Sequence, residues 1–85
     1  MAYTIQFKPL AQRQFENLPR NVQRRIATKV ESLREDPFPP GCKKLAAVNG
    51  AWRIRVGDYR VIYQVHRGEL LVLVITIGHR SDVYR

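Results

Sequence analysis

Apolar and polar residues alternate at the start of the chain and then change to a helical spacing. The alternation from Met1 to Phe7 predicts a half-buried first strand. Over residues 9–18, apolar side chains recur at i, i+4 and i+7, which predicts a short helix with proline in its first turn. A longer helix is predicted after Pro19, since Asn21 can cap it and apolar residues share one face as far as Leu33. We expect these two helices to form an antiparallel hairpin.

A proline-rich segment separates the helices from three further strands. Asp36 to Gly41 contains three prolines and cannot continue a helix, so it is expected to form a rigid loop. Alternation predicts strands over residues 52–56 and 59–66, joined by a tight turn at Gly57-Asp58, and the apolar run from Leu70 to Ile77 predicts a central strand. The predicted fold is α+β in the order β-α-α-β-β-β, with an antiparallel sheet of about four strands packed against the helical hairpin. All 85 residues, 1–85, are expected to form a single domain.

The alternation within the two paired strands separates an apolar face from a cationic one. The side chains expected to point into the helix-covered core are Trp52, Ile54, Tyr59, Val61 and Tyr63. The side chains expected on the opposite, open face are Arg53, Arg55 and Arg60. Several positive charges would then converge on a small area, and a phosphate-rich ligand suits such a face because guanidinium groups bind phosphate oxygens in a bidentate manner.

The net charge narrows the class of partner. Fifteen Lys and Arg residues against seven Asp and Glu give a formal net charge of +8. A small domain with this charge attracts polyanions before any specific contact forms. RNA or DNA is therefore the leading partner class, although the same excess can keep a small protein in solution or attract an acidic protein.

Few residues are available for metal binding, disulfides or membrane insertion. Cys42 is the single cysteine and the chain has two histidines, so neither an internal disulfide nor a zinc site is expected. The longest apolar run is far shorter than the roughly 20 residues needed to cross a bilayer, and the amino terminus lacks the apolar core of a secretory signal. We expect a cytoplasmic protein with no metal, no cofactor and no membrane contact.

Arg55 and Arg60 are the first candidates for chemistry, because they flank the turn between two paired strands. At that separation two guanidinium groups can hold the non-bridging oxygens of one phosphate. Arginines on an exposed face also form salt bridges, here to Asp58, Glu69 or Asp82, or cover a sheet edge. The sequence pattern is compatible with both interpretations.

Further candidates lie at the carboxyl end. His79 and Arg80 follow the last predicted strand, where groups from different strands can meet. A histidine there can transfer protons near neutral pH, or it can simply form a hydrogen bond at the end of the strand. Tyr84 can stack on a base or anchor the terminus against the core.

Other cations can contact the backbone of a nucleic acid. The candidate RNA-binding residues are Arg53, Lys43 and Lys44. On the longer helix, Arg24, Arg25 and Lys29 can form a separate backbone-binding stripe, although a solvated helix face is the commoner outcome. No phosphate-binding loop, pair of catalytic carboxylates or Ser/His/Asp set is discernible, so an enzymatic function depends on the basic cluster.

The chain resembles RelE-type toxins of the RelE/ParE superfamily over almost its whole length. The resemblance rests on the predicted order of elements, on the run WRIRVGDYRVIYQV and on the ending GHRSDVYR. It implies a small bacterial or archaeal endoribonuclease that cuts messenger RNA in the ribosomal A site during translation. The implied reaction needs no metal, since the ribose 2′-hydroxyl attacks the adjacent phosphate and leaves a cyclic phosphate and a free 5′-hydroxyl.

The resemblance also implies roles for individual residues. Those implied to stabilise the scissile phosphate or to stack on the cleaved nucleotide are Arg60, Arg80 and Tyr84. Arg53 and Arg55 occupy positions that are lysines in the best-known RelE enzymes. A guanidinium stabilises negative charge but hardly releases its proton, which puts an acid or base role at these positions in question. His79 then becomes a candidate proton carrier.

The resemblance implies partners, and two other functions fit the same sequence. The implied partners are the ribosome, messenger RNA and a RelB-like antitoxin with an acidic segment, and DNA contact is expected only through the antitoxin complex. ParE-type toxins share the fold but inhibit DNA gyrase without cleaving RNA. A basic module can also bind RNA without catalysis. The retained arginines and tyrosine favour the RelE type.

Overall fold

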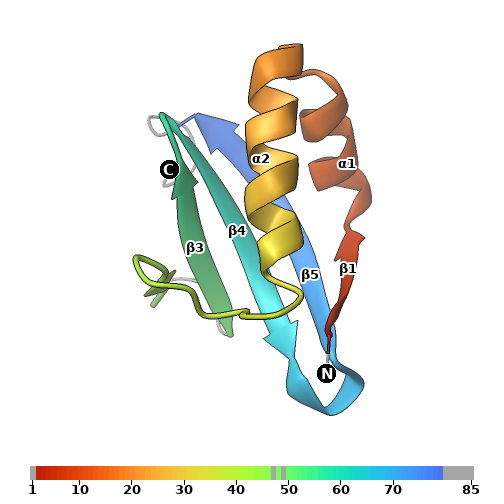
Figure 1. Cartoon of the computed structure of the whole chain (residues 1–85), viewed down its shortest axis with the longest axis vertical. Helices are drawn as coiled ribbons and strands as arrows, with labels where there is room; N and C mark the ends of the chain where they lie inside the picture. Colours follow the sequence, from red (N-terminus) through yellow and green to blue (C-terminus); the bar gives the residue numbers. More distant parts are fainter. Residues whose placement is uncertain (1, 47, 49, 80–85) are drawn as a thin grey trace.

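The structure, a computed structural model that describes residues 2–46, 48 and 50–79, places two helices on one face of a five-stranded sheet (Figure 1). In chain order the elements are β1 (Thr4–Phe7), α1 (Pro9–Glu16), α2 (Arg20–Ser32), β2 (Lys43–Lys44), β3 (Ala51–Val56), β4 (Tyr59–His66), the 3-10 helix η1 (Arg67–Glu69) and β5 (Leu71–His79). The predicted α+β class and the predicted order of the longer elements are confirmed.

Proline determines where each helix begins. Pro9 is the first residue of α1, where its missing N–H costs no intrahelical hydrogen bond. Pro19 precedes α2 as its N-cap residue, and its carbonyl accepts a hydrogen bond from the backbone N of Gln23 at 2.9 Å. The prediction that Asn21 caps α2 is wrong, because the helix already begins at Arg20 and Asn21 lies inside its first turn. In the described part of the chain, neither helix is long and apolar enough to cross a membrane.

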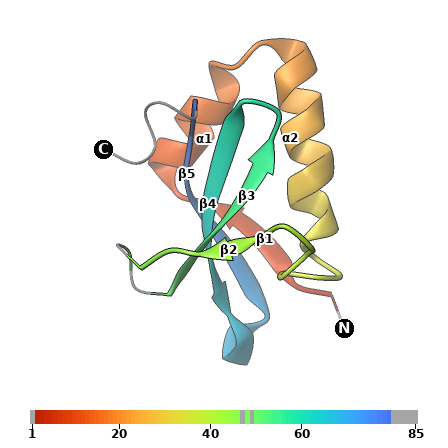
Figure 2. The same ribbon diagram turned by 90° about the vertical axis from the view of Figure 1, so that its left-hand side faces the viewer.

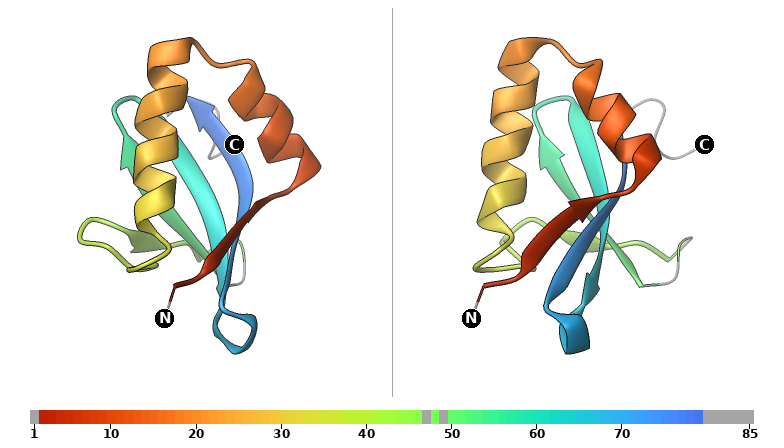
Figure 3. Two further views of the ribbon diagram at one scale, coloured as in Figure 1. Left: turned by 45° about the vertical axis from the view of Figure 1, so that its right-hand side comes forward. Right: turned by 90° about the vertical axis from the view of Figure 1, so that its right-hand side faces the viewer.

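The sheet is mixed, with the strand order β1-β5-β4-β3-β2 (Figures 2 and 3). β1 runs parallel to β5, with Thr4 opposite Leu71, whereas all other neighbouring strands are antiparallel. The predicted antiparallel sheet of about four strands is therefore corrected in two respects, a parallel pair at one edge and a fifth strand at the other. Alternation identifies a strand but not the direction of its partner, and the two residues of β2 are too few to show a period.

Gln14 on α1 covers the edge of β5 beyond the end of β1. Its side-chain oxygen accepts a hydrogen bond from the backbone N of Ile77 at 2.8 Å and another from Oγ1 of Thr76 at 3.0 Å. An uncovered strand edge would leave such backbone groups unpaired. The contact fixes the end of β5, where Gly78 lies opposite Arg60 of β4.

Apolar side chains of the helices and the sheet meet in one core between the two layers. On α2 and directly after it, Ile26 and Leu33 have no exposed surface. The predicted inward face of the sheet is confirmed: its fully buried members are Ile54, Val61 and Tyr63, and its partly buried members are Trp52 and Tyr59. The helices cover this face alone, as Figure 1 and Figure 3 show together, so the arginines of β3 and β4 lie on the other face.

Candidate nucleic-acid interface

Arg55 and Arg60 lie directly opposite each other on β3 and β4. The turn between them consists of Gly57 and Asp58, and Gly57 has the positive φ of 60° that suits a two-residue hairpin loop. Opposed residues in such a pair have Cβ atoms about 4.5–5.5 Å apart, and like charges at that spacing destabilise the hairpin. Arg55 is exposed and Arg60 is half-buried. An anion placed between the two guanidinium groups would convert this repulsion into a favourable contact.

The strand register continues this row onto β5, where Gly78 lies opposite Arg60. Glycine has no side chain that could cover Arg60 from that side. Arg55, Arg60 and Gly78 therefore form one row across β3, β4 and β5, at the end of the sheet near the β3–β4 turn. A phosphate needs both the charge and the space.

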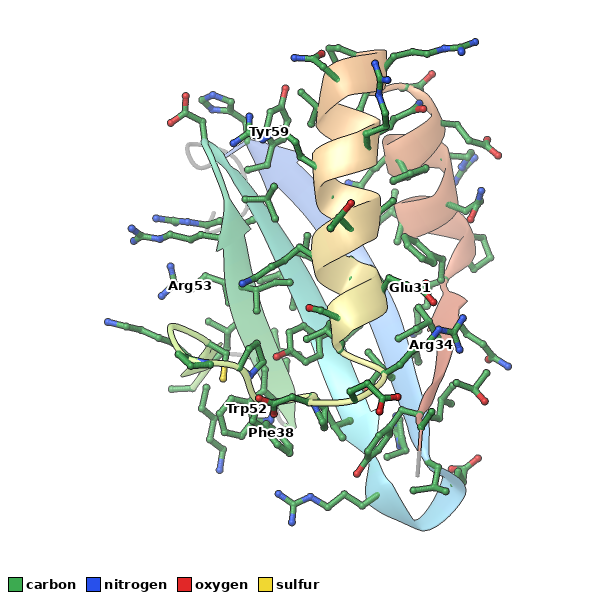
Figure 4. The ribbon with its side chains drawn as sticks, in the orientation of Figure 1. Glu31, Arg34, Phe38, Trp52, Arg53 and Tyr59 are labelled. Carbon is green, nitrogen blue, oxygen red and sulfur yellow. The ribbon has the colours of Figure 1, made fainter. Side chains whose placement is uncertain are left out.

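Arg53 lies in the next row, opposite Lys43 of β2 and Ile62 of β4. Its side chain is 5% exposed, and its Nε is buried without a hydrogen-bond partner. Figure 4 shows Arg53 extending from β3 away from α2. The sequence placed this arginine on an open face, but the neighbouring Ile62 is also only 3% exposed, so this part of the face is covered.

His79 lies on the other face of the sheet. It pairs with Tyr59, and the two rings make an edge-to-face contact at 5.6 Å on the side that carries the core. The cause is a bulge between Ile62 and Tyr63 of β4 and the facing residues of β5, which leaves Ile75 without a counterpart and reverses the alternation beyond it. His79 therefore does not join Arg55 and Arg60, although the sequence grouped the three.

Lys44 also lies away from the arginines. Its partner across the β2–β3 pair is Trp52, whose side chain packs against the core, whereas Lys43 is opposite Arg53. Successive residues of a strand point to opposite faces, so only one of the two predicted lysines can contact the same ligand as Arg53. Arg80 and Tyr84 lie outside the described residues.

Salt bridges to Asp58 or Glu69 were the alternative explanation for the arginines. Among the residues that the structure describes, an ion pair joins Arg34 and Glu31, on the side of α2 away from β3 (Figure 4). Neither Arg53 nor Arg55 is engaged in that way. Asp82, the third carboxylate considered, lies outside the described residues. Among the described residues, no three or more His, Cys, Asp or Glu side chains lie close enough together to hold a metal ion.

Tyr63 fastens the proline-rich loop that precedes Lys43. The phenol donates a hydrogen bond to the carbonyl of Pro37 at 2.7 Å, and Phe38 packs edge-to-face on Trp52 at 4.7 Å (Figure 4). Burial raises the pKa of the Tyr63 phenol well above its ordinary value. The loop thus reaches β2 with its conformation fixed at two points.

Tyr63→Phe is expected to lower the free energy of unfolding by about 1–3 kcal/mol, because the Pro37 carbonyl loses its donor inside the protein. The effect should depend on pH in a defined direction. Since the pKa is raised in the folded state, the stabilisation is complete below about pH 10 and is lost above it, by about 1.4 kcal/mol per pH unit. Urea unfolding of both proteins between pH 7 and 12 measures this, and parallel pH curves would refute the assignment.

The chain is similar to known proteins over nearly its whole length. A family model for the ParE toxin of the type II toxin-antitoxin system parDE matches residues 5–84. The mRNA interferase toxin RelE of Escherichia coli K12 is 30% identical over 88 residues, which cover 99% of this chain and 92% of that protein. Toxin RelG of Mycobacterium tuberculosis is 29% identical over 89 residues, which cover 100% and 99% of the two proteins.

Solved structures agree with the sequence comparisons. The crystal structure of an archaeal RelE–RelB complex from Pyrococcus horikoshii matches with a TM-score of 0.83 at 25% identity, covering 98% of this chain and 100% of that one. The intact E. coli RelBE toxin–antitoxin complex matches with a TM-score of 0.82 at 26% identity, covering 92% and 96%. The arrangement of helices and sheet described above is thus shared with these proteins.

Proposed function

Because the chain belongs to the RelE/ParE superfamily of type II toxin-antitoxin toxins and is of the RelE type, we propose that it is an endoribonuclease that cleaves messenger RNA in the ribosomal A site. The observation that supports this most strongly is the cross-strand pair of Arg55 and Arg60 next to Gly78. Two guanidinium groups on directly opposed positions of paired strands can hold the oxygens of one phosphate. The relative named as an mRNA interferase supports the same activity.

The proposed reaction uses charge stabilisation by the protein. The ribose 2′-oxygen forms a bond to phosphorus while the bond from phosphorus to the 5′-oxygen breaks, the 2′-hydroxyl loses its proton, and the leaving 5′-oxygen gains one. Negative charge grows on the non-bridging oxygens, where Arg55 and Arg60 would donate hydrogen bonds. The guanidinium groups keep their protons throughout, so they stabilise the transition state and do not act as bases.

Roles for the remaining candidates follow from their positions. We assign Arg80 to the same phosphate and Tyr84 to the cleaved nucleotide, as the resemblance implies. His79 is left out of the proton transfer, because its ring contacts Tyr59 on the opposite face of the sheet. Lys43 would bind the RNA backbone beside the cleaved phosphate, and Arg53, which is 5% exposed, would act on it through its charge.

The proposed partners are the ribosome with its messenger RNA and a RelB-like antitoxin. Both solved structures described above are complexes of RelE with RelB. A net charge of +8 favours both an acidic antitoxin segment and an RNA-rich ribosomal site.

Inhibition of DNA gyrase is the second candidate, and the ParE description of the matching family model is the observation in its favour. One experiment separates the two functions. Purified protein added to a translation extract should arrest synthesis, and primer extension should map message breaks in the A site, while supercoiling by purified gyrase continues. If supercoiling were blocked and the messenger RNA stayed intact, the proposed nuclease function would be wrong and inhibition of gyrase would be supported.

A further inference from the structure

Two cations of α2, together with Lys43, Arg53 and Arg55, line two adjoining cavities between α2 and the outer edge of β3. The first cavity, of about 310 Å³, is lined by Lys29, Pro40, Gly41, Lys43, Arg53, Ile54 and Arg55. The second, of about 430 Å³, is lined by Arg25, Thr28, Lys29, Ser32, Arg55, Val56 and Gly57. Lys29 and Arg55 line both cavities, so the cavities adjoin, and together we call them the α2–β3 groove.

The charges of the α2–β3 groove are of one sign. Five of its lining residues are Lys or Arg, and none is Asp or Glu. None of the five takes part in the ion pair between Arg34 and Glu31. Arg53 borders this groove from β3, although its side chain extends away from α2. Cations gathered without a neighbouring carboxylate favour a bound anion, whose charge offsets their mutual repulsion.

Arg25 connects the groove to the Arg55–Arg60 pair. Its guanidinium lies on Gly57, so closely that a Cβ atom at that position would be 2.7 Å from Nη2 of Arg25. Glycine at the turn therefore lets a helix cation approach the backbone between the two paired arginines. A strand of RNA that lies on that pair can pass over the edge of β3 and meet Arg25 and Lys29 next.

The lining of the groove fits a nucleic-acid backbone better than a protein segment. The cores of protein interfaces are apolar and rich in aromatic side chains, whereas phosphate contacts come mainly from Arg, Lys and backbone N–H groups. The groove has no aromatic residue, and its apolar members are Pro40, Ile54 and Val56. The hydroxyl groups of Thr28 and Ser32 donate hydrogen bonds to carbonyl groups of α2. The lysines and arginines are therefore the side chains that would contact a ligand in the groove.

We propose that the α2–β3 groove binds backbone phosphates of the single RNA strand that continues from the cleaved phosphate. The proposal rests on the proposed nuclease function for the path of that strand. Arg55 would contact both the strand at the cleavage position and its continuation, and Arg25 and Lys29 would contact the continuation alone. The groove thus lengthens the site by several nucleotides.

Arg25→Gln combined with Lys29→Gln tests the proposal through RNA binding. The probe is a fluorescent 12-nucleotide RNA whose 2′-O-methyl groups prevent cleavage, titrated at several salt concentrations. Each phosphate contact to a single strand contributes about 0.7 to the slope of log K against log salt, so the double variant should lose about 1.4 from the slope and bind roughly 10- to 30-fold more weakly near 0.1 M salt. The charge-preserving change Arg25→Lys with Lys29→Arg should keep most of the affinity.

The matched control is Arg13→Gln combined with Arg20→Gln, which removes the same charge from exposed helix positions outside the groove. For this control, the slope of log K against log salt should equal that of the wild type within experimental error. Equal slopes for the groove variant and the wild type, equal losses in both double variants, or wild type that does not bind the RNA would each overturn the proposal. So would a groove variant that binds the RNA normally but loses affinity for poly-L-glutamate.

The binding result is independent of cleavage, because the probe cannot be cut. The wild-type protein could bind the probe through the groove and yet leave messenger RNA intact in the translation extract. That result would contradict the proposed nuclease function but not the proposed RNA binding by the groove. Circular dichroism of each variant confirms that the measured losses do not come from unfolding.

Discussion

Arg60→Ala is expected to lower the rate of message cleavage on programmed ribosomes by about 10²–10³-fold, the usual effect of removing one donor that stabilises charge in a transition state. Arg60 is half-buried on β4 and faces Arg55 on one side and Gly78 on the other. In the proposed reaction its guanidinium would donate hydrogen bonds to the phosphate oxygens on which charge develops. Single-turnover cleavage followed by primer extension measures the rate directly.

Two further variants test whether the loss of cleavage rate is specific to the guanidinium group of Arg60. Arg60→Lys keeps the positive charge but loses the planar fork, so it should recover part of the rate. Arg13→Ala removes an exposed arginine of α1 and should leave the rate unchanged. If Arg60→Ala cleaved at the wild-type rate while remaining folded, the phosphate would not lie between the paired arginines.

Ile26→Ala is expected to lower the free energy of unfolding by about 2–5 kcal/mol, as other large-to-small changes in packed cores do. Ile26 is fully buried where α2 faces the sheet. A domain of this length has a total stability of only about 4–13 kcal/mol, so the loss is a large share of it. Because the same helix carries Arg25 and Lys29, its attachment to the sheet also maintains the groove.

Urea unfolding at neutral pH measures the change, with Thr28→Ala as the control on the exposed side of α2. Thr28 bonds only to the carbonyl of Arg24 in its own helix, so its loss should stay within about 0.5 kcal/mol. A loss below about 1 kcal/mol for Ile26→Ala would mean that α2 is not packed as described.

The local pattern of the sequence was sufficient to predict which side chains lie on each face of the β3–β4 hairpin. Side chains alternate with a period of two, and a two-residue turn puts Arg55 opposite Arg60, so both features follow from residues close together in the chain. Burial of Ile54 and Val61 confirms the face that was assigned to the core. The direction of β1 could not be predicted, because it depends on which strand lies beside it after the chain has passed through both helices.

The errors in the candidate site have the same physical origin. Val72 and Val74 of β5 point into the core, and unbroken alternation from them would put His79 on the arginine face. The bulge at Ile75 reverses the alternation, so Ile77 is buried instead and His79 follows it to the same side. Nothing in the apolar run of β5 marks the position of a bulge. The α2–β3 groove could not be predicted from the sequence for a related reason. Arg25 and Arg55 are far apart in the chain, and only the packing of α2 on the sheet brings them to the same groove.

The central claim is that the paired arginines hold a phosphate while the neighbouring 2′-hydroxyl attacks it. The most direct test gives the purified protein ribosomes programmed with either an all-RNA message or the same message with one 2′-deoxynucleotide at the mapped cleavage position. We predict that the all-RNA message is cut, leaving a 2′,3′-cyclic phosphate end, and that the deoxy message stays intact at that position. Cleavage of both messages, or of neither, would contradict the account.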